Sequence, residues 1–366
     1  MRNETRPINV RLSDDNLAVI ILDQTALPAS TTFIELEGEQ DMFEAIVMLK
    51  VRGAPAIGIF AAFCYAVLAN GTHTDNNKVF AEEAKRFKAH LESARPTAVN
   101  LAWALNRMEA VVLANGDTPV AAIKEALITE AIKIQQEDMR MCESIARHGL
   151  PLLNDGDGVL THCNAGPLAT SIYGTALGPV ILARQSGMAV RVFADETRPL
   201  LQGARITSYE LTREGVDVTL ICDNMVSAVM KNGWINACFV GCDRIAANGD
   251  AANKIGTSGV AILAKHYKIP FYVLGPSNTI DPDCETGDGI TIELRDPNEI
   301  KQMFFTKPVA PDSVNCYNPA FDVTDHTLIS GIVTEYGILR PPYSESIAAL
   351  KDYITKKIYQ TRRISS

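Results

Sequence analysis

The sequence lacks several patterns that would assign it to a familiar type of site. Its eight cysteines include no C-x-x-C pair, so they show neither a zinc-ligand spacing nor a disulfide framework. It also contains no G-x-G-x-x-G fingerprint, no P-loop and no G-x-S-x-G nucleophile motif. We therefore expect no NAD, no ATP, no metal, no other cofactor and no serine-type triad.

Charge and hydropathy exclude two further classes of partner. The 366 residues carry 34 Lys and Arg against 43 Asp and Glu, a net charge of −9, whereas a general nucleic-acid surface needs clustered cations. No apolar run reaches the length of a membrane span, and the polar residues 1–5 do not resemble a signal peptide. We therefore expect no nucleic-acid partner, no membrane association and a location in the reducing cytoplasm, where free cysteines are common.

What is present is an ordinary globular composition, 47% hydrophobic and 21% charged, on a chain long enough for two domains. After two short strands, over 17–22 and 31–36, the first part is predicted to be mainly helical. The pattern changes at 150–157, where proline, asparagine and glycine cluster. We predict an α/β fold: a mainly helical N-terminal domain with a small β element, residues 1–150, and a Rossmann-like parallel-sheet catalytic domain, residues 151–366.

Regular alternation of strands and helices defines the second domain. Five apolar segments are predicted to be its parallel strands: 159–163, 190–194, 216–222, 237–242 and 270–274. Helical segments of suitable length lie between them, such as 168–185 and 200–213, so right-handed crossovers are expected. Further along the chain, the pattern predicts a strand over 289–294 and a short helix over 327–336.

Two arginines in the helical region stand directly before predicted helix starts. Arg52, Gly53 and Ala54 precede a proline that suits a first helical turn, and glycine lets the backbone approach a ligand closely. Arg95 precedes another proline, which we also expect in a first helical turn. One such arginine indicates no more than a surface side chain, whereas two in the same local context favour an anion-binding role.

Polar side chains follow the predicted strands at their carboxyl ends, where open α/β sheets bind ligands. Cys163 follows the first strand, Asp243 follows the fourth, and Gln202 lies in the segment after the second. A cysteine between a strand and a following helix start suits a reactive thiolate, although most single cysteines are buried and inert. His162 should face the opposite side of the strand, so we interpret it as a core histidine.

The segment 241–257 offers a carboxylate and an anion-binding element close together. Asp243 ends a buried strand, while Asn253 and Lys254 are predicted to open a helix over 255–266. Free amide groups and the positive end of the helix dipole favour an anion at that position. Taken alone, the segment is better interpreted as an N-capped helix with a solvated lysine.

Together, the strand ends indicate a more specific chemistry. One thiol and one carboxyl group among several cations and amides suit acid–base work on a phosphorylated polar substrate. A thiolate can abstract a proton next to an oxygenated carbon, and a carboxylic acid kept protonated by burial can return one. This pairing fits aldose–ketose isomerisation, which requires no cofactor.

Five ordered motifs resemble the S-methyl-5-thioribose-1-phosphate isomerase family of methionine salvage: RGAPAIG at 52–58, RPTAVN at 95–100, THCNAG at 161–166, DETRPLLQG at 195–203 and GCDRIAANGDAANKIGT at 241–257. The resemblance runs from Asp23 to the C-terminal region. It implies conversion of the cyclic aldose S-methyl-5-thio-α-D-ribose 1-phosphate into the open-chain ketose S-methyl-5-thio-D-ribulose 1-phosphate. It also implies an N-terminal domain joined to a Rossmann-like domain, and a homodimer.

By position in these motifs, the resemblance implies that Cys163 is the catalytic cysteine and Asp243 the catalytic acid. It further implies that seven residues bind the substrate and its phosphate: Arg52, Gly53, Ala54, Arg95, Gln202, Asn253 and Lys254. Two positions depart from the expected pattern, Pro167 and Cys242, and Cys242 adds a second, redox-sensitive thiol near the site. Because both predicted domains contribute residues, we expect a cleft between them that closes during the reaction.

Several alternatives stay open. Sister isomerases act on 5-deoxyribose 1-phosphate or on ribose 1,5-bisphosphate, although the second basic cluster that a bisphosphate needs is not seen. Regulatory subunits of the eukaryotic initiation-factor nucleotide-exchange complex share the fold without catalysis, but Cys163 and Asp243 together favour an enzyme. A plain sugar-phosphate-binding module would leave that pair unused. Whether the hydrogen moves as a proton or as a hydride is not decided by the sequence.

Overall fold

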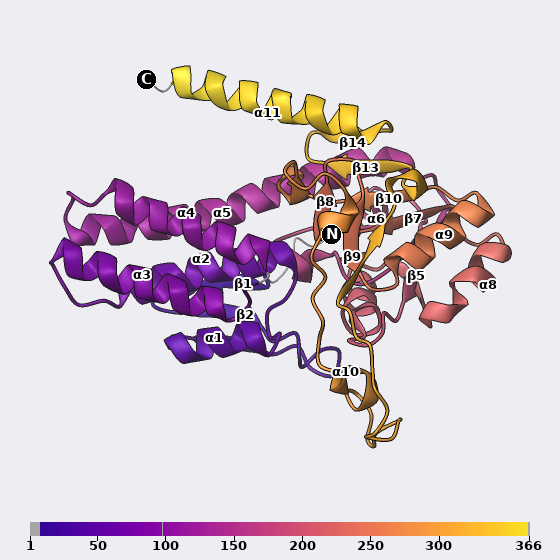
Figure 1. Cartoon of the computed structure of the whole chain (residues 1–366), viewed down its shortest axis with the longest axis horizontal. Helices are drawn as coiled ribbons and strands as arrows, with labels where there is room; N and C mark the ends of the chain where they lie inside the picture. The colour runs from indigo at the N-terminus through magenta and orange to yellow at the C-terminus, as the bar shows by residue number, and fades with distance from the viewer. Residues whose placement is uncertain (1–7, 97, 365–366) are drawn as a thin grey trace. The chain divides into compact units, whose positions relative to one another are not determined.

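The computed structural model describes residues 8–96 and 98–364, which divide into two compact units (Figure 1). The first unit is the described part of Met1–Cys142 together with Gly166–Gly174. The second is Glu143–Ala165 together with the described part of Thr175–Ser366. The division falls inside helix α5 (Val120–Gly149), close to the composition change from which the domain limits were predicted.

The first unit contains the small β element that the sequence predicts. Its three strands pair in the order β1-β2-β3, antiparallel throughout: Val10–Leu12, Val19–Leu22 and Phe33–Leu36. The last two match the predicted strands. Strand β1 was not predicted, because three residues carry too little alternation to indicate a strand.

Helices make up the rest of this unit, as predicted. They are α1 (Glu39–Val47), α2 (Ala54–Asn70), α3 (Asn77–Ser93), α4 (Val99–Ala114) and α5. Every residue from 56 to 67 in α2 is buried, because this helix is apolar on all sides and α1, α3 and α4 pack around it. A Cβ on Gly58 would lie only 2.9 Å from the carbonyl oxygen of Asn100, so the N-terminal turns of α2 and α4 are in direct contact.

The second unit is built on a seven-stranded sheet with the order β14-β13-β10-β7-β4-β5-β6. Its strands are β4 (Gly158–Thr161), β5 (Arg191–Asp195), β6 (Asp217–Ile221), β7 (Ala237–Val240), β10 (Phe271–Leu274), β13 (Gly331–Thr334) and β14 (Gly337–Leu339). All neighbours pair in parallel except β13 with β14. The five predicted strands all lie in this sheet, which confirms the Rossmann-like parallel architecture.

A second, four-stranded sheet in this unit has the order β11-β8-β9-β12. Its strands are β8 (Arg244–Ala246), β9 (Ala251–Lys254), β11 (Ile280–Asp281) and β12 (Phe321–Thr324), and the main helices of the unit are α6 (Gly178–Gln185), α7 (Ser208–Arg213), α8 (Val226–Lys231), α9 (Thr257–Tyr267) and α11 (Tyr343–Ile364). No helix in the described part of the chain is long and apolar enough to cross a membrane.

Several sequence predictions for this unit are wrong. The segment 289–294 forms no strand and makes only an isolated bridge between Leu294 and Pro319. The predicted helix over 327–336 is mostly strand β13, because its apolar run pairs with β10 and is too short for its period to separate strand from helix. Only 178–185 of the helix predicted over 168–185 is α-helical.

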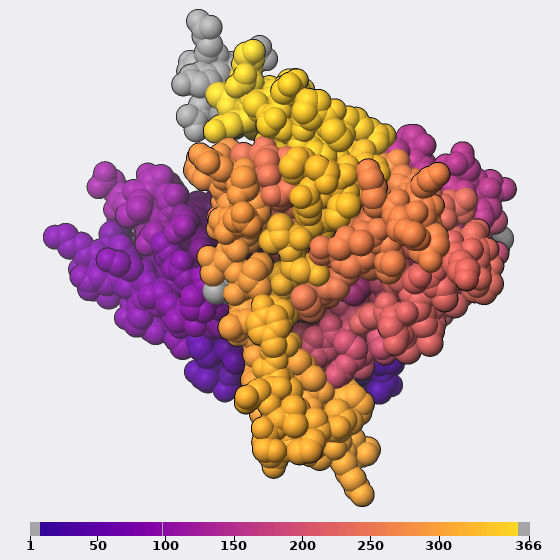
Figure 2. Space-filling view, turned by 45° about the vertical axis from the view of Figure 1, so that its right-hand side comes forward, coloured from indigo at the N-terminus to yellow at the C-terminus, as the bar shows by residue number. Residues whose placement is uncertain are grey.

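A segment around α10 (Asn298–Lys301) projects from the second unit (Figure 2). Two aromatic rings of this projection make cation–π contacts with arginines of the chain segment that follows β5. The Arg205 guanidinium carbon lies 4.7 Å from the Phe304 ring centroid, and that of Arg198 lies 5.1 Å from the Phe305 centroid. The projection is therefore attached to the segment that contains the DETRPLLQG motif.

Candidate active site

The strand order of the large sheet reverses between β4 and β7. From β4 the chain continues to β5 and β6 on one side, and then returns to β7 on the other side of β4. In open α/β sheets, ligands bind outside the carboxyl ends of the strands at such a reversal. The residues that follow β4 and β7 at this position include Cys163 and Asp243.

Cys163 has an unusual backbone conformation. Its φ is 67°, a left-handed value that non-glycine residues seldom adopt and that is concentrated at functional sites. Two threonine hydroxyls hold the turn: Thr197 Oγ1 accepts from the Cys163 N–H at 2.8 Å, and Thr207 Oγ1 donates to the Cys163 carbonyl at 2.7 Å. With Cys163 only 8% exposed, its thiol is confined to a largely buried position.

The expectation of a helix directly after Cys163 is wrong. A short 3₁₀ turn, Pro167–Ala169, comes first, and helix α6 begins only at Gly178. A proline and two glycines in the intervening chain explain why no longer helix forms there. Helix α6 therefore does not begin at Cys163, and hydrogen bonds to two threonine side chains fix the Cys163 backbone instead.

The chain after β5 supplies the two threonines. The Asp223 carboxylate accepts hydrogen bonds from the backbone N–H groups of Thr197 and Arg198, both at 2.7 Å. Gly203 lies so close to a carbonyl oxygen at the end of β5 that a Cβ there would be 1.7 Å away. This contact precedes a π-helix, Gly203–Thr207, a form that is frequent at functional sites.

Gln202 stands directly before this π-helix and is 5% exposed. Its side-chain oxygen Oε1 is buried and has no hydrogen-bond partner among the described residues. Leaving a buried acceptor without a donor costs about 1–3 kcal/mol. The position therefore suits a hydroxyl group of a ligand.

Asp243 lies in the short connection between β7 and β8. Two residues earlier, a Cβ on Gly241 would lie 2.7 Å from the Cβ of Ala165, so the turns after β4 and β7 touch. The backbone N–H of Asp243 donates to the carbonyl of Ala252 on β9 at 2.9 Å. The turn that carries Asp243 thus contacts both the Cys163 turn and the strand that carries Asn253.

The neighbouring thiol of Cys242 is chemically quiet. Burial raises its pKa to about 12, although a hydrogen bond with Thr279 acts in the opposite direction. A thiol with such a pKa stays protonated near neutral pH and is a poor nucleophile. The redox sensitivity expected for Cys242 is therefore not favoured by its surroundings.

Asn253 and Lys254 end strand β9 and do not open a helix, so that prediction is wrong. Helix α9 begins at Thr257, after Gly256 with a φ of 104°. Asn253 and Lys254 pair with Asp322 and Phe321 of β12, and this tertiary pairing outweighs their local preference. The N-terminus of α9 therefore follows Lys254 by three residues in the chain, whereas the prediction placed it at Asn253 and Lys254.

Both side chains are nevertheless buried near the first turn of α9, at 6% exposure each. Asn253 Nδ2 donates to Thr257 Oγ1 at 3.1 Å, and the Thr257 hydroxyl donates to the Lys254 carbonyl at 2.6 Å. The Lys254 ammonium lies 5.4 Å from the centroid of the Phe321 ring. The Lys254 side chain and the N-terminal turn of α9 both favour a nearby anion.

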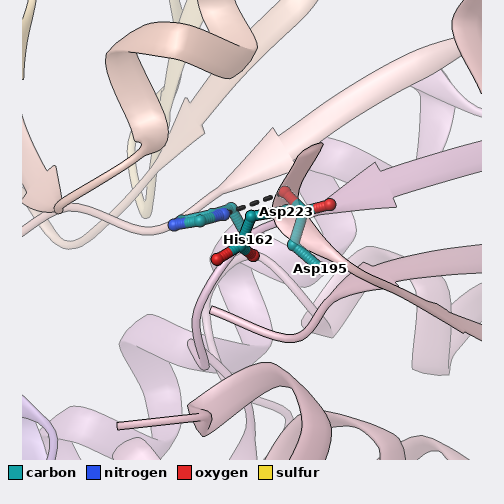
Figure 3. A group of neighbouring side chains, drawn as sticks. All are labelled: His162, Asp195 and Asp223. Carbon is teal, nitrogen blue, oxygen red and sulfur yellow. Dashed lines mark hydrogen bonds and ion pairs between the residues drawn. The ribbon is translucent and has the colours of Figure 1, made fainter. Parts of the chain in front are cut away.

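His162 is buried, as its interpretation as a core histidine predicts, but that interpretation missed its polar partners. Its Nδ1 lies 2.8 Å from Asp195 Oδ2 (Figure 3). Its Nε2 lies 2.8 Å from the Ile255 carbonyl oxygen. Burial raises the pKa of Asp195 to about 6. Burial by itself would lower the pKa of His162. The hydrogen bond to Asp195 and the negative charges of Asp195 and Asp223 together outweigh burial and raise that pKa.

Among the residues that the structure describes, two groups of side chains have the composition of metal ligands, with their ligand atoms within 4.8 Å of one another: His162, Asp195 and Asp223, and Asp250, Asp325 and His326. In the first group both ring nitrogens and both Asp223 oxygens already take part in hydrogen bonds. In the second, Asp250 accepts hydrogen bonds from backbone amides at both oxygens. A metal would have to displace these bonds, so the geometry fits hydrogen-bond networks better.

In the first unit, Arg52, Gly53 and Ala54 lie at the N-terminus of α2. Gly53 has a φ of 94°, and a Cβ there would fall 2.5 Å from the backbone of Ala169. Only glycine fits this approach. Its neighbour belongs to the segment Gly166–Gly174, which follows the Cys163 turn along the chain and is part of the first unit.

Arg95 lies in the connection between α3 and α4. The proline after it precedes the helix, since α4 begins at Val99, so the expectation of a first-turn proline is wrong. Because the N-terminal turns of α2 and α4 touch at Gly58 and Asn100, the chain segments of Arg52 and Arg95 lead into the same end of this helix pair.

The candidate residues thus fall into two groups, one in each unit. The first unit brings together four of them: Arg52, Gly53, Ala54 and Arg95. The second brings together five: Cys163, Gln202, Asp243, Asn253 and Lys254. Sequence reasoning missed Thr197, Thr207 and Asp195 as supports of the cysteine turn, although two of them lie in the DETRPLLQG motif.

Known proteins are similar to this sequence over nearly its whole length. Residues 50–341 match the model of the initiation factor 2 subunit family. A methylthioribose-1-phosphate isomerase from Symbiobacterium thermophilum is 57% identical over 354 residues, 97% of this chain and 98% of the relative. A 5-deoxyribose 1-phosphate isomerase from Petrotoga mobilis is 52% identical over 343 residues, 94% of this chain and 99% of the relative.

Solved structures give the same result for the fold. The crystal structure of 5-methylthioribose 1-phosphate isomerase from Pyrococcus horikoshii OT3 matches with a TM-score of 0.90 at 38% identity, covering 95% of this chain and 97% of that one. The fold and the sequence identity over nearly the whole chain therefore agree. The chain belongs to the initiation factor 2 subunit family and, within it, to the group of methylthioribose-1-phosphate and 5-deoxyribose 1-phosphate isomerases.

Proposed function

We propose that this protein is an aldose–ketose isomerase that converts S-methyl-5-thio-α-D-ribose 1-phosphate into S-methyl-5-thio-D-ribulose 1-phosphate in methionine salvage. The observation that carries the proposal is that Cys163 and Asp243 lie on touching turns at the strand reversal of the sheet. One base and one acid at such a position are what hydrogen transfer between neighbouring carbons requires. Relatives with the name of this activity, more than half identical to the chain, support it.

The reaction begins with ring opening. The Asp243 carboxylic acid protonates the ring oxygen as the bond between that oxygen and carbon 1 breaks, while the phosphate stays on carbon 1. The positive charge that develops at carbon 1 is stabilised by its remaining phosphate oxygen. A site from which water is excluded would protect carbon 1 from attack by water.

Hydrogen transfer follows between carbons 2 and 1. The Cys163 thiolate removes the proton from carbon 2, which gives an enol phosphate across carbons 1 and 2. The same thiol returns the proton to carbon 1, while the hydroxyl on carbon 2 gives its proton back to Asp243 and becomes the ketone. Both residues end in their starting protonation states, so no cofactor is consumed. We favour this proton route because a thiol is placed to act as the base.

Substrate binding is assigned to the remaining candidates. We propose that Lys254 and Asn253 bind the phosphate, and that Arg52, Gly53, Ala54 and Arg95 also bind the substrate. The position of Lys254 beside the N-terminal turn of α9 supports the first role, because a lysine and a helix N-terminus both attract a phosphate. Gln202 would accept a hydrogen bond from a sugar hydroxyl, which its unpartnered, buried Oε1 supports.

A second candidate substrate is 5-deoxyribose 1-phosphate, which carries hydrogen in place of the methylthio group. It is favoured by relatives named for that activity, one of them 52% identical over 94% of this chain. The chemistry at carbons 1 and 2 would be the same, so Cys163 and Asp243 do not separate the two. Only the surroundings of carbon 5 distinguish them.

Turnover of three substrates by the purified protein tests the assignment: methylthioribose 1-phosphate, 5-deoxyribose 1-phosphate and ribose 1,5-bisphosphate. A pocket that accepts the methylthio group should give about tenfold or higher kcat/KM for the first substrate, because burying an extra apolar group gains 1–3 kcal/mol. Higher kcat/KM for either of the others would overturn the substrate assignment. No turnover of any of them, with a Cys163→Ala sample as background, would overturn the isomerase proposal itself.

We further propose that the protein works in the cytoplasm as a homodimer, without a metal, a cofactor or a nucleic-acid partner. All eight cysteines are free thiols, which fits a reducing compartment. Light scattering tests the dimer, and a mass equal to one 39.8 kDa chain would contradict it. Turnover that survives dialysis against EDTA is expected, and loss restored by a divalent cation would contradict the metal-free mechanism.

A further inference from the structure

The imidazole of His162 lies between two elements that carry different parts of the site. The ring is 1% exposed and its Asp195 partner is fully buried. Along the chain, His162 is bonded to Cys163, whereas its Nε2 reaches the carbonyl of Ile255, which is bonded to Lys254. One side chain therefore links the cysteine turn after β4 with the segment that ends β9.

The hydrogen-bond partners determine how many protons the pair holds. A backbone carbonyl only accepts, so His162 Nε2 must carry a proton toward Ile255. A second proton must lie between Nδ1 and Asp195 Oδ2, since two lone pairs 2.8 Å apart would repel. Whether that proton belongs to the ring or to the carboxyl group, the pair as a whole is neutral and both hydrogen bonds are made.

Neighbouring atoms restrict the position of the ring. Gly256 has a φ of 104°, and a Cβ there would lie 2.8 Å from His162 Cε1 and 2.9 Å from Nε2. The Asp322 carboxylate accepts from the N–H groups of Gly256 and Ser258, at 2.8 and 3.1 Å, and so fixes the chain on the far side of the ring. The imidazole is thus held by Asp195 and by the Ile255–Gly256 segment, and Asp322 in turn holds that segment.

The partner Asp195 is also connected to the cysteine turn by its backbone. Its carbonyl accepts from Thr197 Oγ1 at 3.1 Å, and the same hydroxyl oxygen accepts from the Cys163 N–H. Asp195 therefore reaches the turn by two routes, one through Thr197 and one through His162. A displacement of Asp195 would shift both.

We propose that His162 and Asp195 are a positioning pair for the reaction: the imidazole, held between Asp195 Oδ2 and the Ile255 carbonyl, keeps the Cys163 turn in register with the Asn253–Lys254 segment. The pair touches neither the substrate nor the reacting atoms. The inference rests on the proposed function, because it takes Cys163 as the base and Lys254 as a phosphate ligand.

The test compares Asp195→Ala with the isosteric Asp195→Asn. The asparagine amide can donate to Nδ1 while Nε2–H still donates to Ile255, so both hydrogen bonds survive without the shared proton. The alanine variant loses the bond to Nδ1 and leaves the ring free to turn. We expect kcat/KM of Asp195→Ala to fall about 10- to 100-fold, the range typical of residues that orient others in a site. Asp195→Asn should recover most of that loss.

His162→Asn provides a second, independent variant. Its shorter amide can still donate to Asp195 but cannot reach the Ile255 carbonyl, so it should raise KM for the sugar phosphate about fivefold or more through the Lys254 segment. His148→Asn is the matched control, because His148 Nδ1 also lies 3.0 Å from a backbone carbonyl, that of Thr334, but away from these turns. It should keep wild-type kcat and KM.

Circular dichroism and thermal unfolding of each variant accompany the kinetics, which are measured well below the unfolding temperature. A folded Asp195→Ala or His162→Asn with wild-type kcat and KM overturns the proposal. So does an Asp195→Asn variant as impaired as Asp195→Ala, because the effect would then follow the charge and not the hydrogen bonds. Failure of the wild-type protein to turn over any substrate would instead refute the proposed function.

Discussion

The geometry at Cys163 separates this residue from the other cysteines of the chain. Its backbone is left-handed, and both its N–H and its carbonyl are bonded to threonine hydroxyls. Burial is the main cause that raises the pKa of four other thiols: Cys64, Cys142, Cys238 and Cys242. Cys163, with its left-handed backbone held by two hydrogen bonds, is therefore the cysteine expected to react.

Removal of either proposed catalytic group should nearly abolish turnover and leave the fold intact. Cys163→Ala deletes the base, and Asp243→Asn keeps the size of the side chain but removes the acid. Each is expected to lower kcat by about 10²–10⁴-fold, the contribution typical of a positioned proton-transfer group. Steady-state turnover of methylthioribose 1-phosphate measures the effect, with circular dichroism as the check on folding. Near-normal turnover by either variant would contradict the mechanism.

Lys254 is expected to act mainly in binding. Lys254→Ala removes the buried ammonium from beside the Phe321 ring and should raise KM for the sugar phosphate by about tenfold or more, because a charge-assisted hydrogen bond contributes 1.5–3 kcal/mol. Lys254→Arg keeps the charge and tests whether the compact ammonium is required. An alanine variant with unchanged KM would refute the phosphate role.

Among the elements, the link from β9 to α9 shows how a glycine permits a polar contact. Gly256 combines a left-handed backbone with direct contact to the His162 ring, and its N–H donates to Asp322. Burial raises the pKa of Asp322 although these amide hydrogen bonds act against the rise. The link is therefore fixed by tertiary contacts rather than by helix-capping residues in the local sequence.

A pair of glycine substitutions separates backbone strain from this contact. Gly256→Ala and Gly187→Ala both place alanine at a positive φ, 104° and 87°, but only the first collides with a neighbour. We expect Gly256→Ala to destabilise the protein by about 1–3 kcal/mol more than Gly187→Ala, the usual cost of overpacking. Thermal unfolding and kcat/KM of both variants measure the difference. Equal losses in the two variants would show that His162 is not tightly held.

At the scale of the whole chain, a buried carboxyl group ties the long helix α5 to the segment Gly166–Gly174. Asp138 accepts hydrogen bonds from the Ser171 hydroxyl and the Cys142 thiol. Burial nevertheless dominates and raises the pKa of Asp138 from 3.8 to about 6. The folded protein therefore binds this proton more tightly than the unfolded chain does.

Stability should consequently depend on pH through Asp138. Its favourable contribution is complete below about pH 4 and is lost as pH rises through about 6, a loss of about 3 kcal/mol at 1.36 kcal/mol per pKa unit. Asp138→Asn can still accept from Ser171 but does not ionise. It should thus unfold at a higher temperature than the wild type at pH 7.5, and at a similar temperature at pH 4.5.

The matched control for this prediction is Asp14→Asn, since Asp14 is exposed. That variant should differ from the wild type by the same small amount at both pH values. If Asp138→Asn behaved like the control, the buried carboxyl group would not set the pH dependence. If it were less stable at pH 7.5, the ionised form of Asp138 would be stabilised by its surroundings.

Much of the candidate site could be predicted from the sequence, for identifiable reasons. The buried strands are apolar runs bounded by turn residues, so the residues after them, Cys163 and Asp243, were assigned to one edge of the sheet. The glycine at 53 and the apolar surface of α2 likewise follow from local composition. The roles of the individual residues came from ordered motifs, which spacing alone could not supply.

Other features were decided only in the tertiary structure. Asn253 and Lys254 look like the start of a helix, yet they form a strand, because β12 offers backbone partners that local sequence cannot reveal. His162 looks like an ordinary core residue, yet its partners lie 33 and 93 residues away. The sequence by itself therefore determined the sheet and its carboxyl edge, and it placed the proposed reactive pair, Cys163 and Asp243, at that edge. Only folding determined the hydrogen bonds that hold them, because those bonds join residues that have no relation along the chain.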